Sequence, residues 1–325
     1  MENNPRSILI LRFSSIGDIV HSTSVIETLK SYFPDSSIDF MTLSKFAPLV
    51  QNHPKINKVF LVDINDGYFA LRKIGLSIQE NGYDLVIDLH NTTRSRIIRK
   101  AMRKTKSLIL PKPRWKRFNL FMFHKNNFSS DFSVRSWLHD PIKHLLPREY
   151  KISETKLSIS SLEEANGIKF LKDHGLEGDY FVVTPGAAWA QKRWPANYYS
   201  ILIDNIKEKY DLSAVLIGGV NDTNCDDINS MSNNTIIDVH GKTDLRESLA
   251  IISKAKFILG SDTGFLHAGE SLGISAITIL GPTSRETGAG VFLKKSCTVE
   301  NLSLIHISEP TRRYAISYAV FCVKK

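Results

Sequence analysis

The stretch SILILRFSSIGDIVHS, residues 7–22, decides how this chain folds. Its first seven residues, 7–13, form an apolar run of the length and composition of a buried strand. Small residues at Ser14, Ser15 and Gly17 then predict a tight turn. From Asp18 onward, apolar side chains recur at helical spacing as far as Tyr32. A strand, a short turn and a helix in this order predict the first unit of a parallel α/β sheet.

The same alternation continues along the chain. Strands are expected at 37–43, 58–63 and 84–89, with a helix at 69–81, and then strands at 180–184, 213–218, 235–239, 257–260 and 276–280. Helices are expected at about 195–209, 222–232, 244–254 and 264–272. With 325 residues, the chain is long enough for two domains. The sequence therefore predicts two Rossmann-like doubly wound domains, 1–155 and 156–302, facing each other across a cleft with ligands at the carboxyl ends of the strands.

The composition is that of an ordinary globular protein with a basic excess. Forty-two per cent of the residues are hydrophobic, and the formal net charge is +9. Residues 91–125 hold twelve Lys or Arg and no Asp or Glu. Such a segment is expected to bind an anion, which can be a nucleic acid, an anionic membrane surface or a phosphorylated substrate.

Three cysteines without a C-x-x-C pair exclude a disulfide scaffold and a zinc ribbon and fit a reducing compartment. The N-terminus has no secretory apolar region, and no apolar run reaches the roughly 20 residues that span a bilayer. We therefore expect a soluble cytoplasmic protein.

Asp18 has two interpretations. A carboxylate near the start of a helix is a common cap for backbone N–H groups, and this is the favoured interpretation from spacing alone. The alternative places Asp18 at the ligand-binding edge of the sheet as a general base.

Two segments of the second half could bind phosphate. In the first, Gly186 keeps the loop after the strand 180–184 small, and Lys192 and Arg193 add positive charge. The lysine could neutralise a diphosphate leaving group or be a solvated loop charge. Trp194 and Pro195 are typical of a hydrophobic staple at a helix start.

The second segment is GSDTGFLHAG, residues 260–269. It places Asp262, Thr263 and Gly264 at a helix N-terminus, where the helix dipole favours anions. His267 lies close to the same end, with functional and structural roles equally open. The polar loop GPTS, residues 281–284, follows the next strand. P-loop, nucleophile-elbow and zincin motifs are absent, and so is D-x-D, so we expect lysine and backbone dipoles to bind any phosphate.

Taken together, LRFSSIGDIVH (11–21), DLHNTTRS (88–95), PGAAWAQKRWP (185–195) and SDTGFLHAGESLGI (261–274) resemble the lipopolysaccharide heptosyltransferases, glycosyltransferase family 9. The motifs occur in family order over roughly residues 7–300. The resemblance implies the GT-B fold and an inverting transfer without a metal or cofactor, from a nucleotide sugar such as ADP-heptose. It also implies a phosphorylated lipopolysaccharide core as acceptor, at the inner face of the inner membrane.

The resemblance also assigns residues. It implies Asp18 as the general base and Lys192 as the group that binds the diphosphate. The donor site would comprise Thr184, Gly186, Lys192, Arg193, Asp262, Thr263, Gly264 and His267. The acceptor site would comprise Ser15, Gly17, Asn91, Thr92, Arg94, Arg96 and Arg99.

Three alternatives stay open. The enzyme could use another nucleotide sugar or glycan acceptor, or it could be a non-catalytic binder of nucleotide sugars. From a different class, residues 91–125 could bind nucleic acid, since aromatic side chains alternate with the basic ones there. Residues 304–325 match nothing in the family and resemble a translated sequencing adapter, so we expect 303–325 to be a non-native tail.

Overall fold

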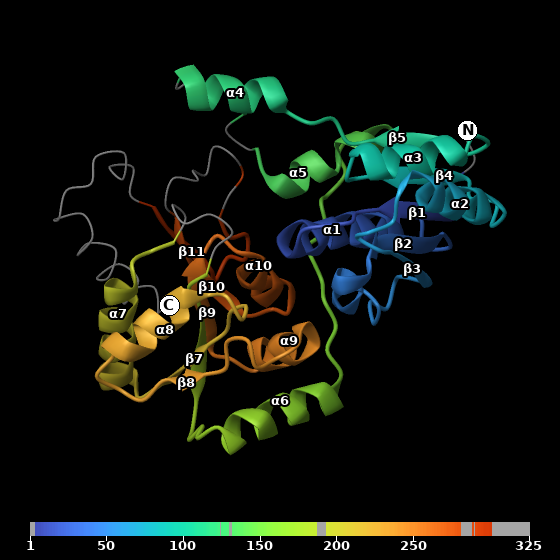
Figure 1. Cartoon of the computed structure of the whole chain (residues 1–325). Coiled ribbons are helices and arrows are strands. Elements are labelled where there is room, and N and C mark those ends of the chain that lie inside the picture. Colours follow the sequence, from blue (N-terminus) through green and yellow to red (C-terminus); the bar gives the residue numbers. More distant parts are fainter. Residues whose placement is uncertain are drawn as a thin grey trace. The chain divides into compact units, whose positions relative to one another are not determined.

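The computed structural model describes residues 4–123, 125–129, 132–186, 193–280, 288 and 290–300. The chain divides into two compact units, with the division between Ser158 and Ile159, a few residues beyond the expected boundary. Residues 301–325, which include the expected non-native tail, lie outside the described residues. Each unit has its own parallel sheet (Figure 1).

The first unit is a five-stranded parallel sheet in the order β3-β2-β1-β4-β5. Its strands are β1 (Ser7–Leu11), β2 (Ser37–Leu43), β3 (Lys58–Val62), β4 (Leu85–Asp88) and β5 (Lys106–Ile109). Its helices are α1 (Ile16–Tyr32), η1 (Ser44–Leu49), α2 (Tyr68–Gln79), α3 (Thr93–Ala101), α4 (Arg114–Phe123), α5 (Val134–Leu138) and η2 (Asp140–Leu145). The strand order turns back on itself at β1, so the switch point of this doubly wound sheet lies between β1 and β4.

Burial explains why β1 is the central strand. Ile8, Leu9, Ile10 and Leu11 are completely buried, because helices cover both faces of a doubly wound sheet. On one side, Gly75 lets α2 approach α3, since a Cβ atom there would lie 2.6 Å from the Ile98 carbonyl oxygen.

Two buried polar residues of α1 bind the chain segment that ends the first unit. The Thr23 and Thr28 hydroxyls accept hydrogen bonds from the backbone N–H groups of Lys156 and Ser153, each at 3.0 Å. The end of the first unit therefore runs along α1 and pairs with it through side chains. His21, on the same helix, is also buried.

The second unit is a six-stranded parallel sheet in the order β11-β10-β9-β6-β7-β8. Its strands are β6 (Tyr180–Thr184), β7 (Ser213–Leu216), β8 (Ile237–Asp238), β9 (Phe257–Ser261), β10 (Ser275–Leu280) and β11 (Cys297–Glu300). Its helices are α6 (Ser161–Asp173), α7 (Ala196–Tyr210), α8 (Thr223–Met231), α9 (Leu245–Ser253) and α10 (Gly264–Ser271). Here the switch point lies between β6 and β9.

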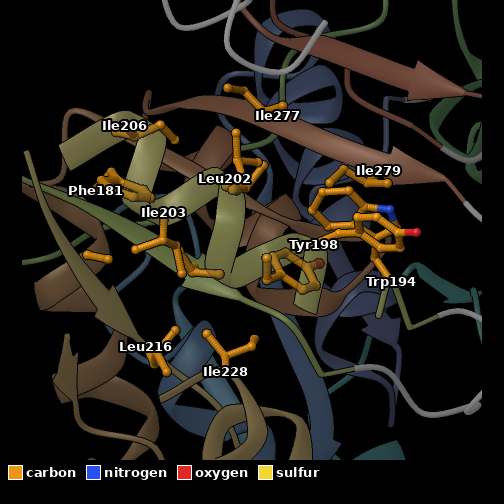
Figure 2. Close-up of a cluster of buried hydrophobic side chains, with 14 of the residues drawn as sticks. Phe181, Trp194, Tyr198, Leu202, Ile203, Ile206, Leu216, Ile228, Ile277 and Ile279 are labelled. Carbon is orange, nitrogen blue, oxygen red and sulfur yellow. The ribbon is translucent and has the colours of Figure 1, made fainter. Parts of the chain in front are cut away.

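Helix α7 packs one apolar face onto this second sheet (Figure 2). Leu202, Ile203 and Ile206 recur at helical spacing and contact strand residues such as Phe181. Trp194, just before the helix, stacks on Tyr198 and meets Tyr199 edge-on, with ring centroids 5.7 and 4.9 Å away. The predicted hydrophobic staple at this helix start is therefore present.

The predicted α/β class with two Rossmann-like parallel sheets is confirmed. Every predicted strand and helix has a counterpart within a few residues of its expected ends. Sequence patterns did not predict α3, β5 and α4 in the basic segment 91–125, nor α5, α6, β11 and the short helices η1 and η2. Across the described ranges, no helix combines the length and the apolar character needed to cross a membrane.

Candidate functional site

In the first unit, the turn between β1 and α1 holds Asp18 through an arginine. An Arg12 Nη atom lies 2.7 Å from Asp18 Oδ1, and the Arg12 side chain also donates to the carbonyl oxygens of Ser14 and Leu89. Arg12 is 6% exposed, whereas the Asp18 side chain is 38% exposed. Arg12 therefore holds the Asp18 carboxylate from the protein interior, while part of the Asp18 side chain remains exposed to solvent.

Asp18 also belongs to a helix cap. Ser15 is the N-cap of α1, and Asp18 Oδ2 accepts hydrogen bonds from the Ser15 backbone N–H and hydroxyl, both at 3.1 Å. The capping interpretation is therefore correct, with Asp18 in the third position of a capping box. It leaves the general-base interpretation open, because a partly exposed carboxylate can cap a helix and still accept a proton.

The charge state of Asp18 follows from these neighbours. Burial raises the pKa of Asp18, but the Arg12 charge and the hydrogen bonds from Ser15 and Arg12 outweigh burial and lower the pKa below its ordinary value of 3.8. Asp18 is therefore ionised at neutral pH, as a general base must be.

The motif DLHNTTRS forms the next turn along the same sheet edge, because Leu11 and Asp88 lie opposite each other in the β1–β4 register. Asp88 is fully buried. It accepts hydrogen bonds from the backbone N–H groups of His90 and Asn91 at 3.0 and 2.7 Å, and from Arg99 Nε at 2.8 Å. The carboxylate of Asp88 therefore organises the turn.

Several predicted acceptor residues have structural contacts in this turn. The Asn91 amide donates to the Leu110 carbonyl oxygen at 2.8 Å, and Thr92 is the N-cap of α3. Arg94 donates to the carbonyl oxygens of Asp63 and Ile64, and Arg99 pairs with Asp88.

Among the predicted acceptor residues, the basic side chain of Arg96 is exposed, and no ion pair of Arg96 occurs among the described residues. Arg96 is thus the most accessible of the three arginines predicted to bind the acceptor. Ser15 is also exposed, and Gly17 is half-buried beside Asp18.

In the second unit, β6 and β9 end side by side at the switch point. Thr184 lies opposite Gly260 in the register, and its hydroxyl oxygen is 3.5 Å from that of Thr263. A Cβ atom at position 260 would lie 2.4 Å from the Thr184 carbonyl oxygen, so only glycine fits there. The two threonines therefore meet at the edge where ligands bind in this architecture.

Helix α10 begins at this point. Thr263 is its N-cap and accepts a hydrogen bond from the Leu266 N–H, while Gly264 is the first helical residue. His267 is 7% exposed, and its Nε2 atom lies 3.1 Å from Asp262 Oδ1. The structure thus brings the predicted donor residues Thr184, Asp262, Thr263, Gly264 and His267 together at one helix N-terminus, which can bind phosphate.

The loop after β6 is described only in part. Gly186 lies so close to Asp222 that a Cβ atom there would be 1.7 Å from Asp222 Oδ2. Arg193 is half-buried, and its charge opposes the burial that raises the pKa of Asp222. Lys192 and the loop 281–284 lie outside the described residues, so their predicted roles stay predictions.

Arg12 and Asp222 were not predicted from the sequence. Arg12 lies two residues before the small-residue turn, and a basic residue there could have indicated a partner for Asp18. Asp222 Oδ1 is buried and has no hydrogen-bond partner among the described residues, so it can accept a hydrogen bond from a ligand hydroxyl. Its position at the start of α8, after a pair of glycines, was the available signal.

One group of side chains could resemble a metal site. Ligand atoms of Asp226, Asp238 and His240 lie within 4.8 Å of one another. His240 Nδ1 is 2.6 Å from Asp238 Oδ1, and Nε2 is 3.5 Å from Asp226 Oδ1. Because both ring nitrogens face carboxylates, the arrangement is that of an imidazole held between two acids.

Residues 71–308 match the family model described as "Glycosyltransferase family 9 (heptosyltransferase)". The chain belongs to glycosyltransferase family 9. This family 9 protein is therefore a glycosyltransferase, as predicted, and its two Rossmann-like units are those of the GT-B fold.

Relatives and solved structures that are similar to this family 9 chain support the family assignment and the fold. The lipopolysaccharide heptosyltransferase 2 of Salmonella typhimurium is 25% identical over 304 residues, which cover 85% of this chain and 83% of the relative. A glycosyltransferase family 9 structure from Veillonella parvula superposes with a TM-score of 0.83 at 18% identity, covering 99% of both chains. The E. coli ADP-heptose heptosyltransferase II structure gives a TM-score of 0.74 at 20% identity, covering 98% of this chain and all of that one. The GT-B fold is thus shown.

Proposed function

We propose that this glycosyltransferase transfers heptose from ADP-heptose to the phosphorylated inner core of lipopolysaccharide. The observation that carries the proposal is the carboxylate of Asp18, held ionised by Arg12 at the carboxyl end of β1. The relatives support the substrates, because the Salmonella typhimurium protein is a lipopolysaccharide heptosyltransferase and the E. coli structure is described as an ADP-heptose enzyme.

Asp18 would act on the acceptor. The exposed side of the Asp18 carboxylate accepts the proton of an acceptor hydroxyl, while the oxygen of that hydroxyl attacks the anomeric carbon of heptose. The new glycosidic bond forms as the bond to the diphosphate breaks, and ADP leaves with the electron pair. Attack from the face opposite the diphosphate inverts the configuration at the anomeric carbon.

The second unit would bind the nucleotide. The backbone N–H groups at the start of α10 and the Thr263 hydroxyl can bind the diphosphate, and we propose that Lys192 neutralises the charge that develops on it. The sequence has no D-x-D carboxylate pair for a metal-bound nucleotide. We therefore propose a metal-independent reaction, for which full turnover in the presence of a chelator is expected.

The place of the reaction also belongs to the proposal. A lipopolysaccharide core acceptor is anchored in a membrane by its lipid, so the enzyme would work at the inner face of the inner membrane. Of the three arginines predicted to bind the acceptor, Arg96 is the exposed one, and we expect it to contact an acceptor phosphate.

A thermal-shift panel with ADP, UDP, GDP and a short oligonucleotide tests the donor. A ligand at 100 times its Kd stabilises the folded state by about 2.7 kcal/mol, so the nucleotide of the true donor is readily identified. Stabilisation by ADP, followed by heptose transfer from ADP-heptose to an inner-core acceptor, supports the proposal. A shift with UDP or GDP but not ADP would assign another sugar donor, and ADP binding without turnover would indicate a non-catalytic binder.

A further inference from the structure

Helix α4 lies in the basic region of the first unit (Figure 1). This helix exposes an unusual number of large apolar side chains. Four of its ten residues are large, apolar and at least 45% exposed: Trp115 at 77%, Phe118 at 45%, Met122 at 62% and Phe123 at 67%. Single exposed apolar residues are normal on protein surfaces, but a cluster on one helix indicates a contact surface.

The helix geometry arranges these side chains into a stripe. Trp115, Phe118 and Met122 are spaced three and four residues apart, so they lie on one face of the helix. Each residue advances about 100° around an α-helix, which places Arg114 and Lys116 on opposite flanks of Trp115. Both basic side chains are exposed. The result is an apolar stripe with a cation on each side.

The opposite side of α4 attaches the helix to its own unit. On that side the Arg117 guanidinium lies 5.7 Å from the centre of the Trp137 ring. Trp137 in turn donates a hydrogen bond to the Pro111 carbonyl oxygen at 2.6 Å. Lys116, on the flank of the stripe, is exposed and its ammonium lies 5.8 Å from the centre of the Phe128 ring. These contacts leave the apolar stripe outward.

The surroundings indicate what the stripe contacts. Residues 91–125 contain no acidic residue, and basic side chains within or beside α4 are exposed, so the partner is anionic; these are Lys112, Arg114, Lys116, Arg117 and Lys125. The Trp115 and Phe118 rings meet edge to face at 87°, and Phe118 and Phe123 at 79°. Rings packed in this way form one apolar ridge instead of parallel platforms for stacked bases, which favours a lipid surface over a single-stranded nucleic acid.

The topology relates α4 to Asp18 within the first unit. Leu11 pairs with Asp88 and Asp88 with Ile109, so β1, β4 and β5 end at the same edge of the sheet. Asp18 follows β1 at that edge, and α4 follows β5 after a short segment. A surface that binds α4 therefore lies on the side of the sheet from which an acceptor would reach Asp18.

We propose that α4 is a membrane-docking helix for a bilayer that contains anionic lipids. The ridge of Trp115, Phe118, Met122 and Phe123 inserts at the level of the headgroups, and Arg114 and Lys116 bind lipid phosphates. The inference deepens the proposed function and rests on it for its biological meaning, because a lipid-anchored acceptor requires an enzyme at the bilayer.

Flotation of the full chain with vesicles tests the docking. The vesicles contain phosphatidylglycerol and phosphatidylcholine, and phosphatidylcholine vesicles serve as the reference. The protein should bind only the anionic vesicles, and less at high salt. Each cation near an anionic surface contributes about fivefold in affinity, so R114Q with K116Q should weaken binding about 25-fold. W115S with F118S should weaken it at any salt concentration.

A matched variant provides the control. L162S with K169Q and K172Q removes one exposed apolar and two exposed basic side chains from α6 of the second unit. This variant should bind anionic vesicles as the parent does. Brominated lipids should quench the fluorescence of Trp115, and W115F should remove that quenching.

Three results would overturn the docking helix. Equal vesicle binding by the α4 variants and the parent is one, and equal weakening by the α6 control is another. The third is a dimer in analytical ultracentrifugation that W115S with F118S dissociates, since a second copy would then cover the stripe. Tight oligonucleotide binding that R114Q with K116Q abolishes, without vesicle binding by the parent, would favour the nucleic-acid alternative.

The docking helix and the heptose transfer fail separately. Vesicle binding requires neither donor nor acceptor, whereas transfer to a short, water-soluble core acceptor requires no vesicle. The α4 variants should keep parental turnover with that soluble acceptor and lose turnover only with a lipid-anchored acceptor in vesicles. Absent transfer to either acceptor by a parent that binds vesicles would refute the proposed function alone.

Discussion

Replacing Asp18 by Asn separates the two roles that the structure gives this carboxylate. Loss of a positioned general base lowers turnover by about 10² to 10⁴, which is a barrier increase of about 2.7 to 5.4 kcal/mol. We therefore expect D18N to lower kcat at least a hundredfold. The cap should suffer much less, because the Asn side chain keeps an oxygen that can accept from the Ser15 N–H.

The cost in stability can be estimated from the same contacts. The ion pair of Asp18 with Arg12 involves a side chain that is 38% exposed, so solvent screening limits its contribution to about 1 kcal/mol. Weakening the cap adds about another 1 kcal/mol at most. A total of about 2 kcal/mol leaves the protein folded at assay temperature if its stability is typical of a globular domain.

Glu163 in the second unit is a matched control. Its carboxylate accepts from the N-cap Ser160 N–H and hydroxyl at 2.8 and 2.7 Å and pairs with Arg246 at 2.7 Å. It is therefore a capping-box carboxylate with an arginine partner, like Asp18. E163Q should destabilise the chain as D18N does but keep parental turnover.

The assay follows ADP release from ADP-heptose with an inner-core acceptor, and urea denaturation gives the free energy of unfolding. If D18N kept kcat within tenfold of the parent, Asp18 would be only a cap. An equal loss of kcat in E163Q would attribute the effect to lost stability.

Three further predictions concern the neighbouring residues. In R12Q the positive charge that lowers the Asp18 pKa is lost while burial remains, so the pKa of Asp18 should rise. Because the base must be ionised, the acid limb of kcat/KM should move to higher pH than in the parent. R99Q leaves the buried Asp88 carboxylate without its ion pair, so the free energy of unfolding measured in urea should fall by about 3 kcal/mol. R96Q should keep the parental stability and raise the acceptor KM. T263V removes the hydroxyl at the α10 N-terminus and should raise the Kd for ADP about tenfold in calorimetry.

Each of these has a contradicting result. An unchanged acid limb in R12Q would mean that Asp18 does not limit turnover at low pH. Parental stability of R99Q would show that Asp88 finds another partner. An unchanged ADP affinity in T263V would place the diphosphate away from this helix end.

Most of the fold could be predicted from the sequence because strands buried on both faces form apolar runs. The run 7–13 and the run 257–260 are both of this kind, and each precedes a turn of small residues. Strand β5 was missed because only two of its four residues, Leu108 and Ile109, are apolar and basic residues surround it. Helix α4 was missed because its aromatic and basic residues alternate without a buried face.

The candidate site could be predicted only in part. Helix-start motifs placed Asp18 and Thr263 correctly, since caps depend on residues a few positions apart. The roles of Arg94 and Arg99 could not be predicted, because their contacts with the Asp63 carbonyl and with Asp88 depend on strand pairing. A net charge count treats Arg94, Arg99 and Arg96 alike. In the structure Arg94 and Arg99 are partly buried and bonded within the unit, whereas Arg96 is exposed.

Gly186 and Gly260, near the proposed nucleotide site, have a consequence for engineering. A side chain at position 260 would collide with the Thr184 backbone carbonyl, and one at position 186 would displace the Asp222 carboxylate. A mutant library intended to change the nucleotide preference should therefore keep both glycines fixed. Diversity is better introduced at Thr184, Asp222 and Thr263, whose side chains can change size without forcing two backbones apart.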